Sequence, residues 1–186
     1  FKKQRLEHFA GRLEALSAMR NYLDSDVNKV FSIIGPSGSG KTSLIAKAIE
    51  EAEVRNAVIV YRFIGTTAVS SNTFRLLSDI IKEIAQGYGT EPSALLREAE
   101  ETKLTTVRGL QEIVPRCIGL ATKEKRLFVF LDSLDQLGQD QTSLELGWIP
   151  REIPENTRIV VSTLPELKDR LNHTVTYDLS PMPERE

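Results

Sequence analysis

The chain has 186 residues, of which 40% are hydrophobic and 27% are charged, and its formal net charge is −2. These values are typical of one soluble globular domain that buries roughly two-thirds of its unfolded surface. The small net charge argues against a general nucleic-acid clamp, so we do not expect nucleic acid as a partner.

No apolar run approaches the roughly 18 residues that span a bilayer, so we expect no membrane contact. The one cysteine, Cys117, cannot form an internal disulfide, so we expect a reducing, cytoplasmic compartment.

Short runs of β-branched and aromatic residues alternate with helical repeats of apolar residues along the chain. The predicted elements are, in chain order, a helix over 12–24, a strand over 29–34, a helix over 43–53, a strand over 57–63, helices over 73–85 and 104–121, and strands over 126–132, 158–163 and 174–179. Pro115 predicts a bend in the last helix. Near-continuous apolar strands separated by helices are typical of a parallel sheet covered on both faces, and the pattern therefore predicts an α/β fold.

A glycine-rich segment joins the first predicted strand to the helix after it. Its sequence, GPSGSGKT at residues 35–42, satisfies the pattern G-x-x-x-x-G-K-[ST], which a chain of this length matches by chance on the order of once in a hundred. Glycine lets the backbone approach an anion closely, and the freed N–H groups and the helix N-terminus then face the phosphates. We therefore predict a nucleotide site formed by Gly35, Pro36, Ser37, Gly38, Ser39, Gly40, Lys41, Thr42 and Ser43.

Two side chains at the end of this segment have distinct predicted roles. The Lys41 ammonium would reach the β- and γ-phosphates, where it binds the nucleotide and takes part in the chemistry. The Thr42 hydroxyl would be a ligand of Mg²⁺, a cation that prefers hard oxygen ligands. The predicted ligand is therefore a nucleotide with Mg²⁺.

The run LFVFLDSLDQLG, residues 127–138, adds two acidic residues to this site. Its apolar half places Asp132 at the C-terminal edge of a strand, where ligands bind in open α/β sheets, and predicts a second Mg²⁺ ligand opposite Thr42. Ser133 cannot act as a general base at neutral pH. Asp135 can, if its carboxylate comes within about one water of the γ-phosphate.

The choice between adenine and guanine rests on a motif that this chain lacks. The residues DQLG fit the D-x-x-G pattern of GTPases, but no N-K-x-D motif follows them, and NKV at 28–30 lacks the aspartate. We therefore expect ATP or ADP rather than GTP.

The stretch LDSLDQL resembles the Walker B motif of NACHT-type domains, which belong to the STAND class of signalling ATPases. Three further segments are similar to that family, and the second and third of them resemble the forms in its nephrocystin-like, WD-repeat-bearing members. They are HFAGRLEAL at 8–16, YRFIGTTAVSSNTFRLL at 61–77 and RIVVSTLPE at 158–166. The resemblance covers nearly the whole chain.

The resemblance implies a P-loop NTPase three-layer sandwich, with helices on both faces of a five-stranded parallel sheet of order 5-1-4-3-2. It also implies that the strand ending at Asp132 and the strand over 158–163 flank the phosphate-loop strand. In the family, the opening segment lies beside the adenine, a position that here corresponds to Phe9, Gly11 and Arg12.

The same resemblance implies an ATP/ADP switch with slow Mg²⁺-dependent hydrolysis that controls the assembly of a larger signalling protein. We therefore expect a single nucleotide-binding domain over 1–186, cut from a longer multidomain protein, with an adenine-side segment and helix over 1–26 and the NTPase core over 27–180. The expected partners are helical and winged-helix domains, effector or repeat domains outside this chain, and a nucleotide-dependent homo-oligomer.

One departure from the family affects catalysis. Many relatives end the fourth strand with an arginine that senses the γ-phosphate, whereas here Leu164 follows Thr163. The hydroxyls of Ser162 and Thr163 are then the remaining candidate sensors, and hydrolysis should be slow. An AAA-type mechanical ATPase and a nucleotide-binding structural module without catalysis stay open as alternatives. The candidates for an arginine that acts on a neighbouring copy are Arg151, Arg158 and Arg170.

Overall fold

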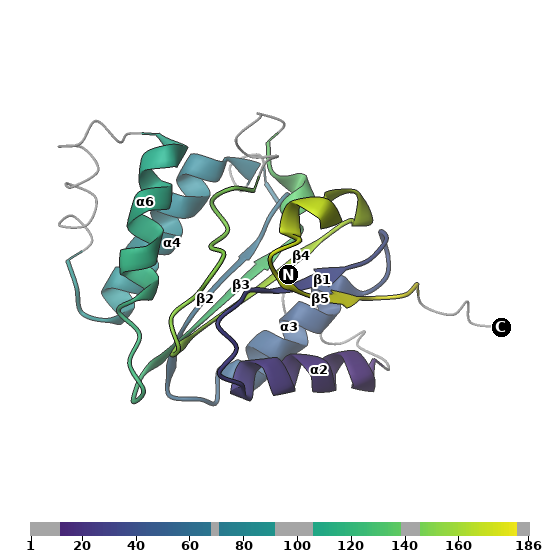
Figure 1. Cartoon of the computed structure of the whole chain (residues 1–186), viewed down its shortest axis with the longest axis horizontal. Coiled ribbons are helices and arrows are strands. Elements are labelled where there is room, and N and C mark those ends of the chain that lie inside the picture. The colour runs from purple at the N-terminus through teal and green to yellow at the C-terminus, as the bar shows by residue number, and fades with distance from the viewer. Residues whose placement is uncertain (1–11, 68–70, 92–105, 139–145, 182–186) are drawn as a thin grey trace.

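The computed structural model describes residues 12–67, 71–91, 106–138 and 146–181 (Figure 1). Phe9 and Gly11, two of the predicted adenine-side residues, lie outside these ranges. The helices are α2 (Leu13–Asp24), α3 (Lys41–Ala52), α4 (Thr73–Gly87) and α6 (Val107–Ile118), and the 3-10 helices are η2 (Leu134–Gln136) and η3 (Pro165–Leu171). The strands are β1 (Phe31–Ile34), β2 (Ala57–Phe63), β3 (Arg126–Asp132), β4 (Thr157–Thr163) and β5 (Val175–Asp178).

The five strands form one parallel sheet of order β2-β3-β4-β1-β5. This is the predicted order 5-1-4-3-2 viewed from the other edge, and the predicted α/β sandwich is confirmed. One expectation was wrong: β1 lies between β4 and β5, and β3 lies on the far side of β4. The order 5-1-4-3-2 itself requires this, because it places β4 between the phosphate-loop strand and the acidic strand.

The register brings three functional segments to one edge of the sheet. Ile34, the last residue of β1, pairs with Thr163, the last residue of β4, and the β3 residue Leu131 pairs with Val161. All the strands run in the same direction, so the segments that follow β1, β3 and β4 leave the sheet at its C-terminal edge. In open α/β sheets that edge is the place where ligands bind.

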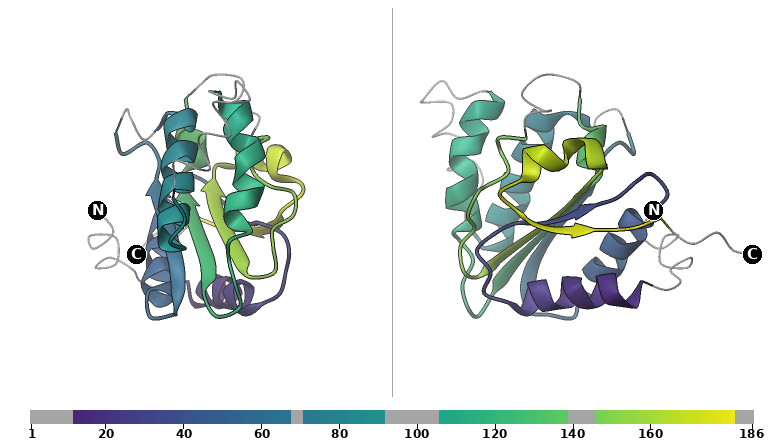
Figure 2. Two further views of the ribbon diagram at one scale, coloured as in Figure 1. Left: turned by 90° about the vertical axis from the view of Figure 1, so that its left-hand side faces the viewer. Right: turned by 45° about the vertical axis from the view of Figure 1, so that its right-hand side comes forward.

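The sheet lies between helices on its two faces (Figure 2), and an apolar cluster packs against each face. Along β3, Leu127, Val129 and Leu131 face a cluster formed with α4 and α6, whereas Phe128 and Phe130 face a cluster formed with α2 and α3. This alternation follows from the two-residue period of a strand. The central strands β1, β3 and β4 are therefore buried on both faces, as their near-continuous apolar sequences predicted, whereas β5 at the edge of the sheet is largely exposed.

The helix ends follow local chemistry. The Asn72 side chain accepts a hydrogen bond from the Arg75 N–H at the start of α4, and the Thr106 hydroxyl accepts one from Gly109 at the start of α6. Such caps satisfy backbone donors that the helix leaves free, and they explain why α6 begins later than predicted. Pro115 lies inside α6, which continues to Ile118.

Cys117 lies buried on α6 in the apolar layer. Burial raises the pKa of its thiol to about 11. A thiol in that state is a packing residue rather than a nucleophile. None of the helices in the described ranges combines the length and the apolar character that crossing a membrane would require.

Candidate functional site

The phosphate loop runs from the end of β1 to the start of α3, as the sequence predicted. Gly38 and Gly40 have φ angles of 76° and 89°, in the left-handed region that glycine adopts without strain. Gly35 is needed for a different reason, because a Cβ there would lie 2.6 Å from the Leu179 carbonyl oxygen and 2.7 Å from Ser39 Oγ. The loop can therefore close onto the start of α3, whose first N–H groups lack partners within the helix.

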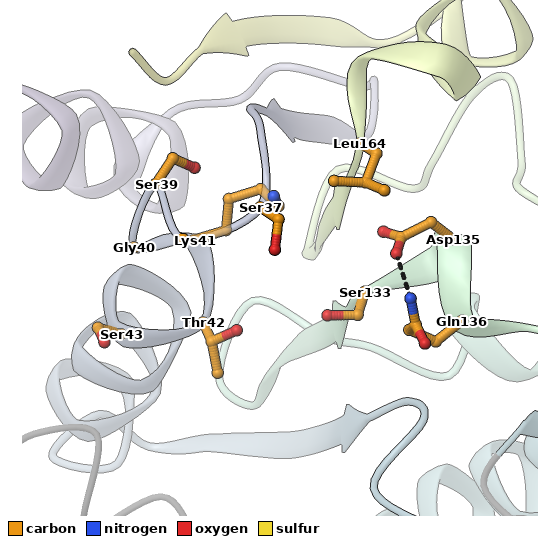
Figure 3. A pocket seen from close by; sticks show the side chains of 11 residues that line it. Ser37, Ser39, Gly40, Lys41, Thr42, Ser43, Ser133, Asp135, Gln136 and Leu164 are labelled. Carbon is orange, nitrogen blue, oxygen red and sulfur yellow. Dashed lines mark hydrogen bonds between the residues drawn. The ribbon is translucent and has the colours of Figure 1, made fainter. Parts of the chain in front are cut away.

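A polar pocket of about 470 Å³ opens above this loop (Figure 3). Its lining residues are Ser37, Gly38, Ser39, Gly40, Lys41, Thr42, Ser43, Ser133, Asp135, Gln136 and Leu164. Figure 3 shows the Thr42 and Ser133 hydroxyls pointing toward one another across the pocket, with the Asp135 carboxylate on the side of η2. The structure thus brings together the phosphate loop and the acidic turn, which are about ninety positions apart in the chain. Gly35 and Pro36 contribute backbone behind the lining.

Lys41 is held inside the phosphate loop. Its Nζ donates hydrogen bonds to the carbonyl oxygens of Gly35, at 2.5 Å, and Pro36, at 3.0 Å. Burial lowers the pKa of the Lys41 ammonium, and the carboxylates of Asp135, Asp132 and Glu166 oppose that shift. Neutral carbonyl groups replace the water lost on burial only in part. The ammonium is therefore placed to gain from an anion that enters the pocket.

Asp132 ends β3 and is buried below the pocket. Its Oδ1 accepts a hydrogen bond of 2.5 Å from Ser162 Oγ, and the Thr42 hydroxyl also bonds to its carboxylate. Burial nevertheless raises the pKa of Asp132, because it outweighs these hydrogen bonds and the charge of Lys41. The carboxylate and the Thr42 hydroxyl are two adjoining hard oxygen donors, a set that fits Mg²⁺ held jointly by protein and phosphate oxygens.

The chain turns sharply between the two acids. Ser133 has φ 64° and ψ 56°, a left-handed conformation that is uncommon for a residue other than glycine. Its N–H donates to Ser162 Oγ at 2.9 Å, which fixes the turn to β4. The turn leads into η2, where Asp135 lies half-buried at the pocket. Its Oδ2 accepts a hydrogen bond of 2.7 Å from Gln136 Nε2, and Thr163 Oγ1 lies 3.5 Å from its Oδ1.

The two hydroxyls at the end of β4 do not line the pocket. Ser162 and Thr163 are both fully buried, and each is directed at an acid: Ser162 at Asp132 and Thr163 at Asp135. Leu164 lines the pocket in their place. The Thr163 hydroxyl therefore contacts Asp135 rather than the pocket, while the Thr163 carbonyl accepts a hydrogen bond of 3.3 Å from the Gly35 N–H of the phosphate loop.

Arg12 links the predicted adenine side to the phosphate loop. It has a left-handed backbone at φ 64° and precedes α2. Its Nη2 donates to the Ser39 carbonyl at 2.8 Å and to the Ser180 carbonyl at 2.6 Å. A second pocket of about 380 Å³ lies between the start of α2 and the end of β5. It is lined by Arg12, Leu13, Glu14, Ala15, Tyr177, Asp178, Leu179 and Ser180.

Several residues of these pockets were not predicted from the sequence. Gln136 and Leu164 could have been found from the sequence, because they directly follow the candidate site residues Asp135 and Thr163. The β5 residues of the second pocket had none, because only the folded sheet brings β5 beside the start of α2. One candidate is excluded: Arg158 is fully buried at the start of β4, away from the pocket, and donates to the carbonyl groups of Glu155 and Thr157. It cannot act on a neighbouring copy.

A parallel sheet of this order, with a phosphate-binding loop after β1 and a buried aspartate at the end of β3, is the architecture of a P-loop NTPase, a class that binds nucleotides. Residues 8–162 match the family described as the AAA ATPase domain, and the chain belongs to that family.

Similar proteins include two with NACHT domains. The chain is 26% identical over 167 residues to the NACHT and WD repeat domain-containing protein 2 of Homo sapiens, an alignment that covers 83% of this chain and 9% of that protein. It is 28% identical over 182 residues to the NACHT domain- and WD repeat-containing protein 1 of Mus musculus, covering 91% and 11%. The predicted resemblance to NACHT-type P-loop NTPases is confirmed, and the chain spans about a tenth of the length of these relatives.

Solved structures show the same fold. The Aeropyrum pernix ORC1 protein in complex with DNA matches 99% of this chain and 46% of its own, with a TM-score of 0.57 and 16% identity. A chain of the Drosophila ORC bound to AT-rich DNA and Cdc6 matches 98% of this chain and 60% of its own, with a TM-score of 0.51 and 14% identity. At this level of identity the likeness concerns the fold alone.

Proposed function

We propose that this chain is an ATP/ADP-binding switch domain that hydrolyses ATP slowly with Mg²⁺ and whose nucleotide state controls the assembly of a larger protein. The observation that carries the proposal is that the Asp135 carboxylate lines the same pocket as the phosphate loop. A phosphate loop with one acid in the pocket, Asp135, and a second acid buried beside Thr42, Asp132, would supply the groups that hydrolysis requires. The similarity to NACHT and WD repeat proteins many times longer than this chain supports a domain that works within a larger assembly.

The phosphate groups would lie along the loop from Ser37 to Ser43, with the Lys41 ammonium turning from the loop carbonyls toward the β- and γ-phosphates. Thr42 and Asp132 would hold Mg²⁺. Bound there, Mg²⁺ would neutralise negative charge on the phosphate oxygens. It would also relieve the cost of a buried Asp132 carboxylate.

Asp135 would act as the general base. The oxygen of a water forms a bond to the γ-phosphorus, and the bond from that phosphorus to the bridging oxygen breaks, so that its electron pair leaves with ADP. One proton of the water passes to the Asp135 carboxylate and then to solvent or phosphate. The half-buried position of Asp135 beside the loop supports this role.

The composition of the pocket supports slow turnover. Among the described residues that line it, Lys41 carries the positive charge, and no arginine is present. At the position where many relatives have an arginine, Leu164 presents an aliphatic side chain, and Thr163 bonds to Asp135 instead of facing the nucleotide. Charge that develops on the γ-phosphate therefore meets few donors in this chain. Arg151 and Arg170 are exposed and stay candidates for supplying such a charge to a neighbouring copy.

The second pocket would take the adenosine part of the nucleotide. It adjoins the phosphate loop through Arg12, which bonds to Ser39 of the loop and to Ser180 of the pocket wall. The Glu14 and Asp178 carboxylates are acceptors there. An acceptor suits the exocyclic amine of adenine and repels the carbonyl oxygen that guanine has in its place. Phe9 and Gly11 precede Arg12 and would extend the same wall.

Lys41→Ala tests the phosphate site. The variant should lose at least tenfold in affinity for ATP with Mg²⁺, because charge-assisted hydrogen bonds to phosphate are worth roughly 1.5–3 kcal/mol each. Isothermal titration calorimetry measures this loss. Lys47→Ala is the matched control, since Lys47 lies on the same helix but pairs with Glu50 outside the pocket, and it should bind like the parent. Equal affinity in both variants would contradict the proposal.

The same titration repeated with GTP tests the choice of base. ATP should bind more tightly than GTP, and GTP binding more than tenfold tighter than ATP would exclude an adenine site.

Single-turnover hydrolysis with Asp135→Asn separates the switch from a structural module without catalysis. If the parent chain does not hydrolyse ATP, it is a nucleotide-binding module without catalysis.

A further inference from the structure

Gln136 is the pocket residue closest to the proposed base, and the sequence did not single it out. Its Nε2 donates a 2.7 Å hydrogen bond to Asp135 Oδ2, and its side chain lines the pocket (Figure 3). An ionised carboxylate only accepts hydrogen bonds, so the nitrogen of the amide must face Asp135. The two oxygens of Asp135 are therefore unequal: Oδ2 is bonded to Gln136, while Oδ1 has the longer 3.5 Å contact to Thr163.

The stem of Gln136 is fixed from behind by the backbone after β2. Gly65 has φ 81°, and a Cβ on it would lie 2.7 Å from Gln136 Cβ and 2.9 Å from its Cγ. The neighbouring Ile64 N–H donates to the Asp132 carbonyl at 3.1 Å, and the Gln136 N–H donates to the Ser133 carbonyl at 2.9 Å. The amide is thus presented to Asp135 by two backbone segments that pack against each other.

We propose that Gln136 is a positioning residue for hydrolysis, which binds Asp135 Oδ2 and leaves Oδ1 as the atom that takes the proton from water. The proposal rests on the proposed function and assigns its proton transfer to a single oxygen. As Oδ1 accepts the proton, the water oxygen bonds to the γ-phosphorus and ADP departs with the electrons of the broken bond. Without Gln136, the Thr163 contact of 3.5 Å is the side-chain contact left on the carboxylate among the described residues. The carboxylate can then rotate about its terminal torsion, which is broad for aspartate, and fewer arrangements point Oδ1 at the water.

Single-turnover hydrolysis of labelled ATP by the 186-residue chain tests this role. Gln136→Ala should slow hydrolysis about tenfold or more, within the range expected for a weakened general base, and should leave the affinity for ATP with Mg²⁺ within twofold of the parent. Gln86→Ala, an exposed glutamine on α4 outside the pocket, is the matched control and should behave like the parent. Gly65→Ala keeps the amide but crowds its stem, and should also slow hydrolysis.

The pH–rate profile distinguishes positioning from a general structural effect. Gln136→Glu replaces the donor with a second carboxylate, and two neighbouring carboxylates raise the pKa of one of them. The acid limb of the profile should therefore move to higher pH in Gln136→Glu. Parent-like rates in Gln136→Ala and an unmoved acid limb in Gln136→Glu would overturn the inference.

Asp135→Asn in the same assay separates the inference from the function on which it rests. If Asp135→Asn is slow while Gln136→Ala is as fast as the parent, only the role of Gln136 fails. If Asp135→Asn is also as fast as the parent, Asp135 is not the base and both fail. A parent chain without detectable single turnover would overturn both as well.

Discussion

Asp132 is 2% exposed, and this burial disfavours the ionised form of its carboxylate. The hydroxyls of Ser162, Thr42 and Ser133 bond to it, yet burial still raises its pKa. The folded chain therefore binds a proton at Asp132 more readily than the unfolded chain does. Above the raised pKa the ionised group lowers the stability of the ligand-free fold, and as pH falls through that pKa the cost disappears. At neutral pH a bound cation would remove the same cost.

Asp132→Asn should reveal that cost. Without ligand, the melting temperature of the variant at pH 7 should equal or exceed that of the parent, because asparagine carries no charge and can still accept the Ser162 hydrogen bond. Each 1 kcal/mol gained would raise the melting temperature by about 2–4 °C. With ATP, the additional stabilisation by Mg²⁺ seen in the parent should be lost, because an amide is a poorer ligand for a hard cation.

Thermal unfolding between pH 5 and 8, with and without Mg²⁺ and ATP, makes the comparison. Asp79→Asn on the exposed face of α4 is the control and should match the parent. A ligand-free variant that melts several degrees below the parent and keeps its Mg²⁺ response would show that Asp132 is a structural acid.

A single hydroxyl connects the two acids. Ser162 Oγ donates to Asp132 Oδ1 and accepts from the Ser133 N–H, which belongs to the left-handed turn leading to Asp135. The side chain proposed to hold the metal and the segment proposed to carry the base are therefore oriented by the same residue of β4.

At the scale of elements, the phosphate loop depends on close contact with the end of β5. The backbone of Gly35 lies against the Leu179 carbonyl and the Ser39 hydroxyl, with no space for a side chain. Gly35→Ala should therefore displace the loop from β5 and weaken ATP binding at least tenfold. It should also lower stability by about 1–3 kcal/mol, as overpacking in a tight interior does.

Gly147→Ala is the matched control for that variant. A Cβ at Gly147 would meet no atom within 4 Å, and its φ is not in the left-handed region. Calorimetric titration with ATP and thermal unfolding should show Gly147→Ala to be close to the parent. An equally small effect of Gly35→Ala would mean that the loop adapts freely and that the contact with Leu179 does not shape the site.

The sequence correctly predicted those features that depend on residues close together in the chain. All five strands were placed to within about two residues, because runs such as 126–132 are apolar on both faces and end at polar turns. The phosphate loop was predicted because its chemistry depends on residues that are adjacent in the chain. The second pocket was not, because α2 and β5 meet only in three dimensions. Likewise, Ser162 and Thr163 were expected to face the nucleotide, but the strand register directs them at Asp132 and Asp135.

At the scale of the whole molecule, the described residues give a sheet with helices on both faces (Figure 1). The two polar pockets are lined by the phosphate loop, by the segments that follow β3 and β4, and by the end of β5 with the start of α2. The net charge of −2 shows no overall excess of positive charge for a nucleic-acid backbone, whereas two solved structures with this fold contain DNA. The two possibilities differ in how binding depends on salt, because phosphate-backbone contacts release counterions.

We expect this chain to bind a 20-base-pair duplex more weakly than about 10⁻⁴ M at 150 mM salt, which is the weak end of non-specific binding. Fluorescence anisotropy over a salt series, with and without ATP, measures this affinity. Micromolar binding that falls steeply with salt would favour the mechanical AAA-type ATPase over the switch.

The guanidinium of Arg12 bonds at once to the carbonyl of Ser39 in the phosphate loop and to that of Ser180, which is 168 positions away in the sequence. The chain beyond β5 is therefore fastened directly to the loop that would hold the phosphates. Tension applied at Ser180 would load the phosphate loop through Arg12 and the sheet through the 2.6 Å bond from the Leu179 N–H to the Ile34 carbonyl. Coupling free energies are reciprocal. If tension on the chain after β5 weakens nucleotide binding, bound nucleotide must make the loop resist that tension by the same free energy. Arg12 and the backbone of Leu179 would thus couple the chain after β5 to the phosphate loop.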